Sequence, residues 1–448
     1  MKHVPFTHQV KNIKFLQSGW LVCVVFLLSF LLDSSAQTRA EREELFDDAE
    51  FFFQTEEYRE ALYYYKQLHQ YKPDNGNINF QIGMCYLSIP GEEVRAIPYF
   101  EQAAERISYK YKKSTFEEYR APLHTLFYLA RAYRINNELD KALEALDRFT
   151  SSRYFEGNYN IRIVENEIEA AKRAKIIQDK PIELSFTNMG EIINTASDNM
   201  NAVISGDGNT LVYITSLTFY DGLFMSKKVD GKWTEPVNIT PQVGSDGDCY
   251  PTCLSFDGTE LYLTRKLKRN SDLYLSRFEN DNWTLFQPLG DNINTRKDET
   301  HASITKDGKI LYFTSNRKGE GGFDIFRSTR EQNGEWSKPE NLGENINTDL
   351  NEATPFISED GKTLFFSSEG HQNMGGYDIF FSKFENGQWT PPRNIGFPLN
   401  TTGDNLFYQP TSKTTGIINL RNREDSLGES DIYLVEITGG DQFQYLKK

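Results

Sequence analysis

The chain has 448 residues, 38% of them hydrophobic and 25% charged, which is enough apolar sequence for two or three packed domains and excludes intrinsic disorder. Its 49 basic and 64 acidic residues give a formal charge of −15, which argues against nucleic acid or an anionic membrane as the default partner. Only six histidines and four cysteines occur, and none are grouped at metal-ligand spacing, so we expect neither a metal site nor a cofactor.

Residues 1–36 have the pattern of a secretory signal peptide. Three lysines precede an apolar run from Trp20 to Leu32, interrupted by Ser29 alone, and small residues follow up to Ala36. Thirteen residues of helix rise only about 20 Å, short of the roughly 30 Å hydrocarbon core of a bilayer. We therefore predict cleavage after Ala36 and no membrane span in the mature chain, with a retained anchor as the alternative. The predicted location is the periplasm, with association with the outer membrane left open.

Residues 37–178 predict an array of paired helices. Small and aromatic residues recur at similar spacing in three units: Ala49, Phe52, Ala61 and Tyr65; Gly83, Tyr86, Ala96 and Phe100; Ala130, Tyr133, Ala142 and Leu146. Small residues let neighbouring helices approach closely, as in tetratricopeptide repeats, and three units are enough to bury a continuous core. An ordinary helical bundle is the alternative. Within the array, residues 108–119 suggest a helix extension and a loop, residues 160–178 predict a further helix, and residues 179–181 form a linker.

Residues 182–438 repeat one pattern with a period of about 50 residues. Each unit contains short alternating strands, and the first four also contain an Asp-Gly turn and a tryptophan. The turns fall at Asp207, Asp257, Asp307 and Asp360, and the tryptophans at Trp233, Trp283, Trp336 and Trp389. Four strands per unit joined by such turns predict a β-propeller. The fold class is therefore a multidomain chain, α-helical first and then all-β.

Five first strands are expected, starting near Asn199, Tyr250, Thr300, Ala353 and Leu406. The fifth unit lacks a tryptophan strand, whereas residues 182–195 match the end of a fourth strand. We therefore predict a five-bladed ring closed by residues 182–188 pairing beside residues 431–437, since closure removes free sheet edges. Residues 439–448 would be a tail.

Carboxylates recur around the predicted ring. They precede the first strands (Asp198, Asp248, Asp298, Glu299, Glu352, Asp404) and the third strands (Asp272, Asp324, Asp378, Asp431). A carboxylate that every blade repeats is expected to satisfy loop N–H groups rather than to act as a general acid. We also find no nucleophile elbow and no phosphate-binding loop in a suitable context. We expect no enzyme; the alternative is a propeller glycoside hydrolase or another hydrolase that uses channel carboxylates.

The loops between second and third strands differ from blade to blade, and recognition commonly resides in such loops. They carry the residues that we select as candidate binding residues: Arg265, Lys268, Arg269, Arg317, Lys318, His371, Arg421 and Arg423. The prediction is a mixed-charge rim for a peptide, a protein or a glycan, and the alternative is a solvated rim with compensating charges. A groove along the helical array is a second candidate surface, with Phe53, Asn79, Gln81, Tyr86, Phe127 and Arg131 near it.

The strings S-x-D-G-x-x-LYFTS and G-x-x-DIF resemble the WD-like propeller repeat of TolB-type periplasmic proteins. With the helical repeats and the signal peptide, the chain is similar to cell-envelope proteins of certain Gram-negative bacteria, including an outer-membrane-associated component of type IX secretion. Those relatives continue into an OmpA-type peptidoglycan-binding domain, which this sequence lacks, so we expect no anchoring of that kind. The resemblance implies a non-enzymatic scaffold that binds envelope proteins or peptides.

Overall fold

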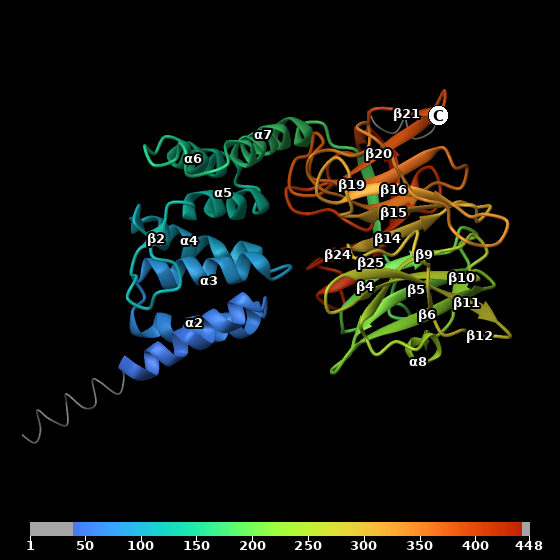
Figure 1. Ribbon diagram of the computed structural model, residues 1–448, viewed down its shortest axis with the longest axis horizontal. Coiled ribbons are helices and arrows are strands. Elements are labelled where there is room, and N and C mark those ends of the chain that lie inside the picture. Colours follow the sequence, from blue (N-terminus) through green and yellow to red (C-terminus); the bar gives the residue numbers. More distant parts are fainter. Residues whose placement is uncertain (1–38, 441–448) are drawn as a thin grey trace, which may run out of the picture. The chain divides into compact units, whose positions relative to one another are not determined.

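The computed structural model describes residues 39–440. They divide into two compact units, one ending at Leu129 and the other beginning at Ala130. The first unit is helical, and the second contains the remaining helices and all the strands of the propeller (Figure 1). The predicted signal peptide and most of the predicted tail lie outside the described residues. Among the described residues, no helix is both long enough and apolar enough to cross a bilayer.

The first unit is built from short helices joined by tight turns. They are a helix at residues 39–54, α2 (Tyr58–Tyr71), α3 (Gly76–Ser88), η1 (Glu93–Ala96), α4 (Ile97–Ala104) and the start of α5 (Thr125–Ile135). The small residues of the predicted pattern are buried where helices meet, Ala49 and Ala61 completely. Gly83 shows why they are small, because a Cβ there would lie 2.6 Å from the ring of Phe100.

The expectation of a helix extension at residues 108–119 is wrong. The chain instead forms the two-residue strands β1 (Ile107–Ser108) and β2 (Ala121–Pro122), which pair in parallel. Between them the chain folds onto the neighbouring helices: the Tyr111 hydroxyl donates to Asn77 Oδ1 at 2.7 Å, and the rings of Phe116 and Phe46 meet edge to face.

As a result α3 is buried on nearly all sides. Three of the predicted groove residues, Asn79, Gln81 and Tyr86, are therefore buried. Asn79 bonds to the backbone of its own N-terminal turn, and Gln81 donates to buried Glu50. The other predicted groove residues, Phe53, Phe127 and Arg131, are half-buried. Of the six candidates for residues near a groove, the three on α3 are therefore not available to a ligand.

The second unit begins with helices that pack on the propeller. They are the end of α5, α6 (Leu139–Thr150) and α7 (Ile161–Gln178), and α7 occupies the predicted helical stretch after the N-cap Asn160. Leu139 of α6 and two alanines of α7 form a buried cluster with Met374 of the propeller. The third helical pair is thus packed into the same unit as the sheets.

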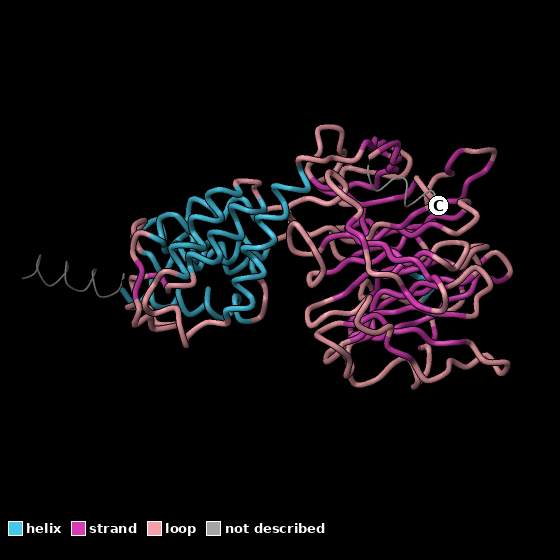
Figure 2. The backbone as a smooth tube through the Cα atoms, turned by 90° about the horizontal axis from the view of Figure 1, so that it is seen from above, coloured by secondary structure: helices cyan, strands magenta, loops and turns pink. Residues whose placement is uncertain are grey.

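The propeller has five blades, each an antiparallel sheet of short strands (Figure 2). Blades 1 to 4 begin with β4 (Asn199–Ile204), β9 (Cys249–Leu254), β14 (Glu299–Ile304) and β18 (Glu352–Ile357). Their second strands are β5 (Thr210–Ser216), β10 (Glu260–Lys266), β15 (Ile310–Ser315) and β19 (Thr363–Ser368). Their third strands are β6 (Asp221–Val229), β11 (Ser271–Glu279), β16 (Asp324–Thr329) and β20 (Asp378–Glu385).

The fourth strands are broken into two-residue pieces. These are β7 (Lys232–Trp233), β8 (Val237–Asn238), β12 (Asn282–Trp283), β13 (Gln287–Pro288), β17 (Glu340–Asn341), β21 (Gln388–Trp389) and β22 (Arg393–Asn394). The piece that carries tryptophan closes a hairpin with the third strand, as where Trp283 lies opposite Phe278. Trp283, Trp336 and Trp389 are buried in clusters that also contain residues of the preceding blade, so they hold adjacent blades together.

The ring closes as predicted. Blade 5 consists of β23 (Gln409–Pro410), β24 (Thr415–Arg421), β25 (Ser430–Gly439) and, as its outer strand, β3 (Glu183–Asn188). Tyr433 lies opposite Asn188 and Val435 opposite Phe186 in this antiparallel pair. The prediction of helices followed by a five-bladed propeller with an N-terminal closing strand is therefore confirmed.

Candidate functional site

The repeated carboxylates at the first strands hold loops in place. Glu352 accepts hydrogen bonds from the N–H and hydroxyl of Thr348 and from the Ser368 hydroxyl, each at 2.7–2.8 Å. Glu299 takes the same partners in blade 3, and Asn199 occupies the equivalent position in blade 1, accepting from Thr195. Burial raises the pKa of the Glu352 carboxyl to about 7. These groups satisfy loop donors, as the sequence analysis expected.

The carboxylates before the third strands have the same role. Asp324 accepts from the N–H groups of Glu320 and Gly321, and Asp378 accepts from the Met374 N–H at 2.8 Å. Burial raises the pKa of Asp378 to about 7. Each of these side chains fixes the loop that precedes its own strand.

Three of the predicted rim residues are structural. The guanidinium of Arg317 pairs with the fully buried Glu299 at 3.0 Å, and its side chain is only 16% exposed. Arg265 pairs with Asp248 and lies over the ring of Phe286. His371 Nε2 lies 2.9 Å from the Ile346 carbonyl, and burial lowers the pKa of its imidazole.

The remaining predicted residues are scattered around the rim, by which we mean the edge formed by the loops between second and third strands. Lys268 and Arg269 in blade 2 and Lys318 in blade 3 are exposed. In blade 5, Arg421 lies 4.0 Å from Asp198, and Arg423 packs over the ring of Phe186. The eight residues come from four different blades, and no cavity described below includes any of them.

The long glycine-rich rim loop of blade 4, residues 369–377, packs against α7 and against the loop that follows blade 4. Arg173 of α7 donates to the carbonyl and to the side-chain oxygen of Asn373, both at 2.7 Å. A Cβ on Gly375 would lie 2.6 Å from the Gly403 carbonyl. Close packing against α7 and the next loop therefore explains the composition of this loop.

Arg134 completes that contact. Its side chain is 2% exposed and pairs with Glu167 of α7, and it also donates to the carbonyl of Thr402 in the loop after blade 4. The variation of the rim that the sequence analysis interpreted as recognition thus includes residues that join the helices to the propeller.

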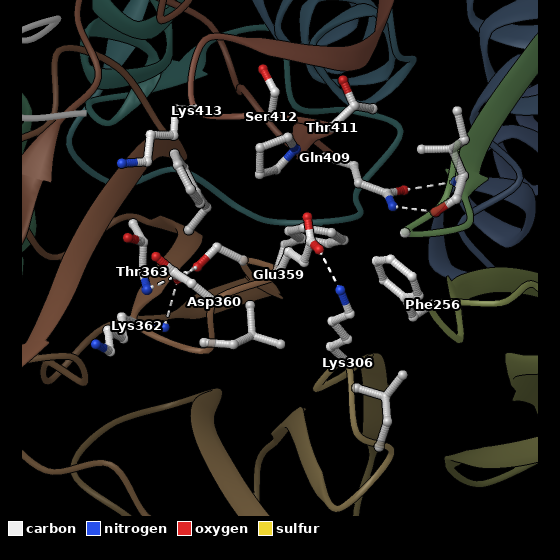
Figure 3. Close-up of a pocket in the computed structure, with 18 of the residues that line it drawn as sticks. Phe256, Lys306, Glu359, Asp360, Lys362, Thr363, Gln409, Thr411, Ser412 and Lys413 are labelled. Carbon is white, nitrogen blue, oxygen red and sulfur yellow. Dashed lines mark hydrogen bonds and ion pairs between the residues drawn. The ribbon is translucent and has the colours of Figure 1, made fainter. Parts of the chain in front are cut away.

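A cavity of about 690 Å³ lies at the opposite end of the strands, among the Asp-Gly turns (Figure 3). We call this end the Asp-Gly face and the cavity the mouth cavity. All five blades line it, for example through Ile204, Leu254, Ile304, Ile357 and Pro410, which end the first strands. The cavity therefore lies where the five inner strands converge.

The turns themselves follow one hydrogen-bonding scheme. In blade 4 the Asp360 carboxylate accepts from the Ser358 hydroxyl at 2.6 Å and from the Lys362 N–H at 2.9 Å. Burial opposes ionisation there, but these bonds outweigh it and keep the pKa of Asp360 below its usual value. Asp207 in blade 1 is held in the same way, also with a lowered pKa.

Only the second residue of each S/T-x-D-G turn is unrepeated. It is Gly206, Phe256, Lys306 and Glu359 in blades 1 to 4, and all four line the mouth cavity. The Phe256 ring covers Gly206, where a Cβ would lie 2.3 Å from a ring atom. Lys306 Nζ lies 4.0 Å from the centre of the Phe256 ring and 2.5 Å from Glu359 Oε1. Four different side chains thus form a continuous series across four blades.

Sequence reasoning missed these residues, although the signal was present. The loops at this end are short and nearly identical, whereas the rim loops are longer and differ from blade to blade, so the sequence favoured the rim as the binding surface. An alignment of the four Asp-Gly turns on their aspartates would have shown one variable position per blade. In blade 5 the turn is replaced by Thr411, Ser412 and Lys413, which also line the cavity.

The mouth cavity combines apolar walls with balanced charge. Its charged lining residues are four lysines (Lys306, Lys362, Lys383, Lys413) and four acids (Asp207, Glu359, Asp360, Glu385). Gln409 closes the seam between blades 5 and 1, because its side chain donates to the Ile204 carbonyl at 2.6 Å and accepts from the Ile204 N–H at 3.0 Å. This arrangement suits a ligand with apolar and mixed polar groups.

The pKa values and positions of the propeller carboxyl groups can be compared with what the hydrolase alternative requires. A general acid needs a raised pKa and a reactive position beside the substrate. Glu352 and Asp378 have raised pKa values but hold loops at the rim, whereas Asp207 and Asp360 line the mouth cavity with lowered pKa values. Within residues 39–440, no group of three or more metal-ligating side chains lies together.

The fold defines a class of protein: helical pairs followed by a five-bladed propeller. No protein-family model and no curated protein matches the sequence. Among solved structures, TolB from Acinetobacter baumannii matches at 15% identity and a TM-score of 0.35, over 64% of this chain and 71% of that one. A putative TolB from Agrobacterium tumefaciens matches at 14% and 0.37, over 58% and 99%. The catalytic domain of a GH62 α-L-arabinofuranosidase from Coprinopsis cinerea matches at 10% and 0.38, over 58% and 98%. At these values the similarities assign neither a family nor a function.

Proposed function

We propose that the chain is a non-enzymatic scaffold of the bacterial envelope that binds a protein partner at the Asp-Gly face of the propeller. The observation that carries this proposal is the series Gly206, Phe256, Lys306 and Glu359 around the mouth cavity. Side chains that stabilise the propeller, such as the turn aspartates and the tryptophans, recur from blade to blade. Different side chains at one position, converging on one cavity, are typical of a recognition site.

The periplasmic location and the kind of partner belong to the same proposal. They follow from the predicted signal peptide at residues 1–36 and from the resemblance of the repeats to TolB-type envelope proteins. The paired helices resemble tetratricopeptide repeats, which commonly hold protein partners. The partner we propose is an envelope protein or a peptide segment of one, in a secretion or assembly process. A glycan is the second candidate, because the mouth cavity offers the Phe256 ring beside polar side chains.

The test is affinity capture from envelope extracts with residues 37–448 as bait. Lys306→Glu places a second negative charge beside Glu359 and should abolish capture of a stoichiometric protein. Lys309→Glu, in the same turn but outside the cavity lining, is the matched control and should capture normally. Thermal unfolding of each bait verifies folding.

Three results would contradict the proposal. Recovery of no stoichiometric partner by folded wild-type bait removes the scaffold function. If the Lys306→Glu variant captures as much partner as the wild type, the partner binds somewhere other than the Asp-Gly face. Hydrolysis of glycosides by the wild-type chain, lost in Glu359→Gln, would establish the hydrolase alternative.

A further inference from the structure

A second cavity of about 620 Å³ opens on the Asp-Gly face between blades 2 and 3. We call it the side cavity. It is lined by the turns of these two blades and by the end of β11, including Phe278 and Glu279. Phe256 and Lys306 line both this cavity and the mouth cavity. The two cavities therefore adjoin, and these two side chains separate them.

Of the two side chains that separate the cavities, Lys306 is the one that needs little free energy to move. Lys306 is held by the Phe256 ring and by Glu359, but the Lys306 and Glu359 side chains are 49% and 61% exposed. An ion pair with that exposure shifts an equilibrium by no more than about fivefold. A ligand that displaces the Lys306 ammonium from Glu359 would join the two cavities.

The two cavities differ in charge. Four lysines and four acids line the mouth cavity, so its formal charge is balanced, and its walls include apolar side chains such as Leu254 and Phe365. The side cavity is lined by four acids (Asp257, Glu260, Glu279, Asp307) against Arg277 and Lys306. Glu260 is already paired with Arg330 and Arg277, and Asp307 lies 3.8 Å from Lys309. Among the described residues, Asp257 and Glu279 are the lining acids that form no ion pair, so the side cavity favours a cationic group and the mouth cavity an apolar one.

We propose that the two cavities form one trough for an extended peptide segment, with Lys306 as a movable partition. This inference rests on the proposed function and specifies its site and its ligand. A large apolar side chain enters the mouth cavity, and a lysine or arginine a few residues along the peptide enters the side cavity. An extended chain advances about 3.3 Å per residue, so a short segment reaches from the propeller centre to the cleft between blades 2 and 3.

The propeller supplies matched positions for blocking each cavity. Glu385 ends β20 opposite Gln388 and lines the mouth cavity. Glu279 ends β11 opposite Asn282 and lines the side cavity. Val229 ends β6 opposite Lys232 and lines neither. Tryptophan at each position adds the same bulk at the same place in a blade.

The experiment selects peptides from a random phage-displayed library on residues 37–448 and measures the affinity of the synthetic peptides by titration calorimetry. We expect the selected peptides to contain a large apolar residue followed by lysine or arginine. Glu279→Trp and Glu385→Trp should each lower affinity at least tenfold, and Val229→Trp should leave it unchanged. Lys306→Ala removes the movable side chain between the cavities and should leave affinity equal or raise it by up to about fivefold.

Other outcomes overturn the inference in distinguishable ways. Loss of affinity in Glu385→Trp alone means that the ligand uses the mouth cavity only. Equal affinity for all three tryptophan variants places the peptides elsewhere on the chain, which removes the trough but leaves a peptide-binding scaffold. No selected peptide, together with oligosaccharide binding that Glu385→Trp abolishes, makes the ligand a glycan. No selected peptide and no oligosaccharide binding contradicts both the trough and the proposed function.

Discussion

The two ends of the propeller differ in what their variation means. At the rim, the loops differ in length and charge, yet Arg317, Arg265 and His371 are bound to neighbouring loops, and the loop at 369–377 packs against α7. At the Asp-Gly face, the turns are short and alike, yet their one variable position lines a cavity of about 690 Å³. Variation in a loop therefore indicates recognition only where the variable side chains converge on open space. The rim should respond to mutation mainly through stability, and the Asp-Gly face mainly through binding.

The largest effect is expected at Arg134. Arg134→Ala leaves the buried carboxylate of Glu167 without its partner, and breaking a buried pair in this way costs about 3–5 kcal/mol of unfolding free energy. Urea unfolding monitored by tryptophan fluorescence would measure it. Arg162→Ala is the control, because Arg162 of α7 and Asp349 of the propeller form an exposed ion pair. Loss of this pair should lower the unfolding free energy by less than about 1 kcal/mol. Equal effects would mean that the buried contact does not stabilise the unit.

Arg317 and Lys318 are adjacent candidate binding residues of the rim, and their substitution should change the unfolding free energy by different amounts. Arg317→Ala removes the partner of Glu299 and the contact with the Phe313 ring, which we expect to lower the unfolding free energy by about 2–4 kcal/mol. Lys318→Ala, at an exposed position, should stay within about 0.5 kcal/mol of wild type. Similar denaturation midpoints for the two variants would contradict the structural role of Arg317.

Asp378 at the rim should make the unfolding free energy depend on pH, with the sign opposite to that of a carboxylate whose pKa is lowered by folding. Burial raises the pKa of Asp378 to about 7, against about 3.9 in an unfolded chain. The folded state therefore favours the protonated form. Its contribution to stability is complete below about pH 4 and is lost as the pH rises through 7.

Asp378→Asn keeps the side chain neutral at every pH, so it should become more stable relative to wild type between pH 5 and pH 8, by about 2–3 kcal/mol. Melting temperatures at the two pH values measure this change. Asp207→Asn at the Asp-Gly face is the control, because hydrogen bonds to the turn lower the pKa of Asp207. Its carboxylate is charged in both the folded and the unfolded state at pH 5 and pH 8, so this variant should lose the same stability at the two pH values. A wild-type-like pH profile for Asp378→Asn would contradict the assignment.

The sequence predicted the parts of the structure that local repetition encodes. The number of blades followed from counting units, because blades 1 to 4 are each built from residues near one another in the chain. The closing strand at Glu183–Asn188 pairs with the far end of the chain, and it was predicted because residues 182–195 match the end of a fourth strand. The bond between Arg173 and Asn373 joins residues 200 apart, and the fold of residues 105–124 depends on contacts with Asn77 and Phe46. No periodicity encodes such contacts. The candidate site was predictable in part. Each Asp-Gly turn can be recognised in the sequence, but only the closed ring of the structure shows that the variable residues of the four turns meet at one cavity.

The smallest effect on stability is expected at the Lys306–Glu359 pair that lies between the two cavities. Lys306 and Glu359 are exposed enough that a double-mutant cycle with Lys306→Ala and Glu359→Ala should give a coupling of about 0–1 kcal/mol in unfolding. Each single variant should therefore unfold close to wild type. A coupling above about 2 kcal/mol would show that the pair holds blades 3 and 4 together. In that case the Asp-Gly face would resemble the rim, and its variable position would be structural as well.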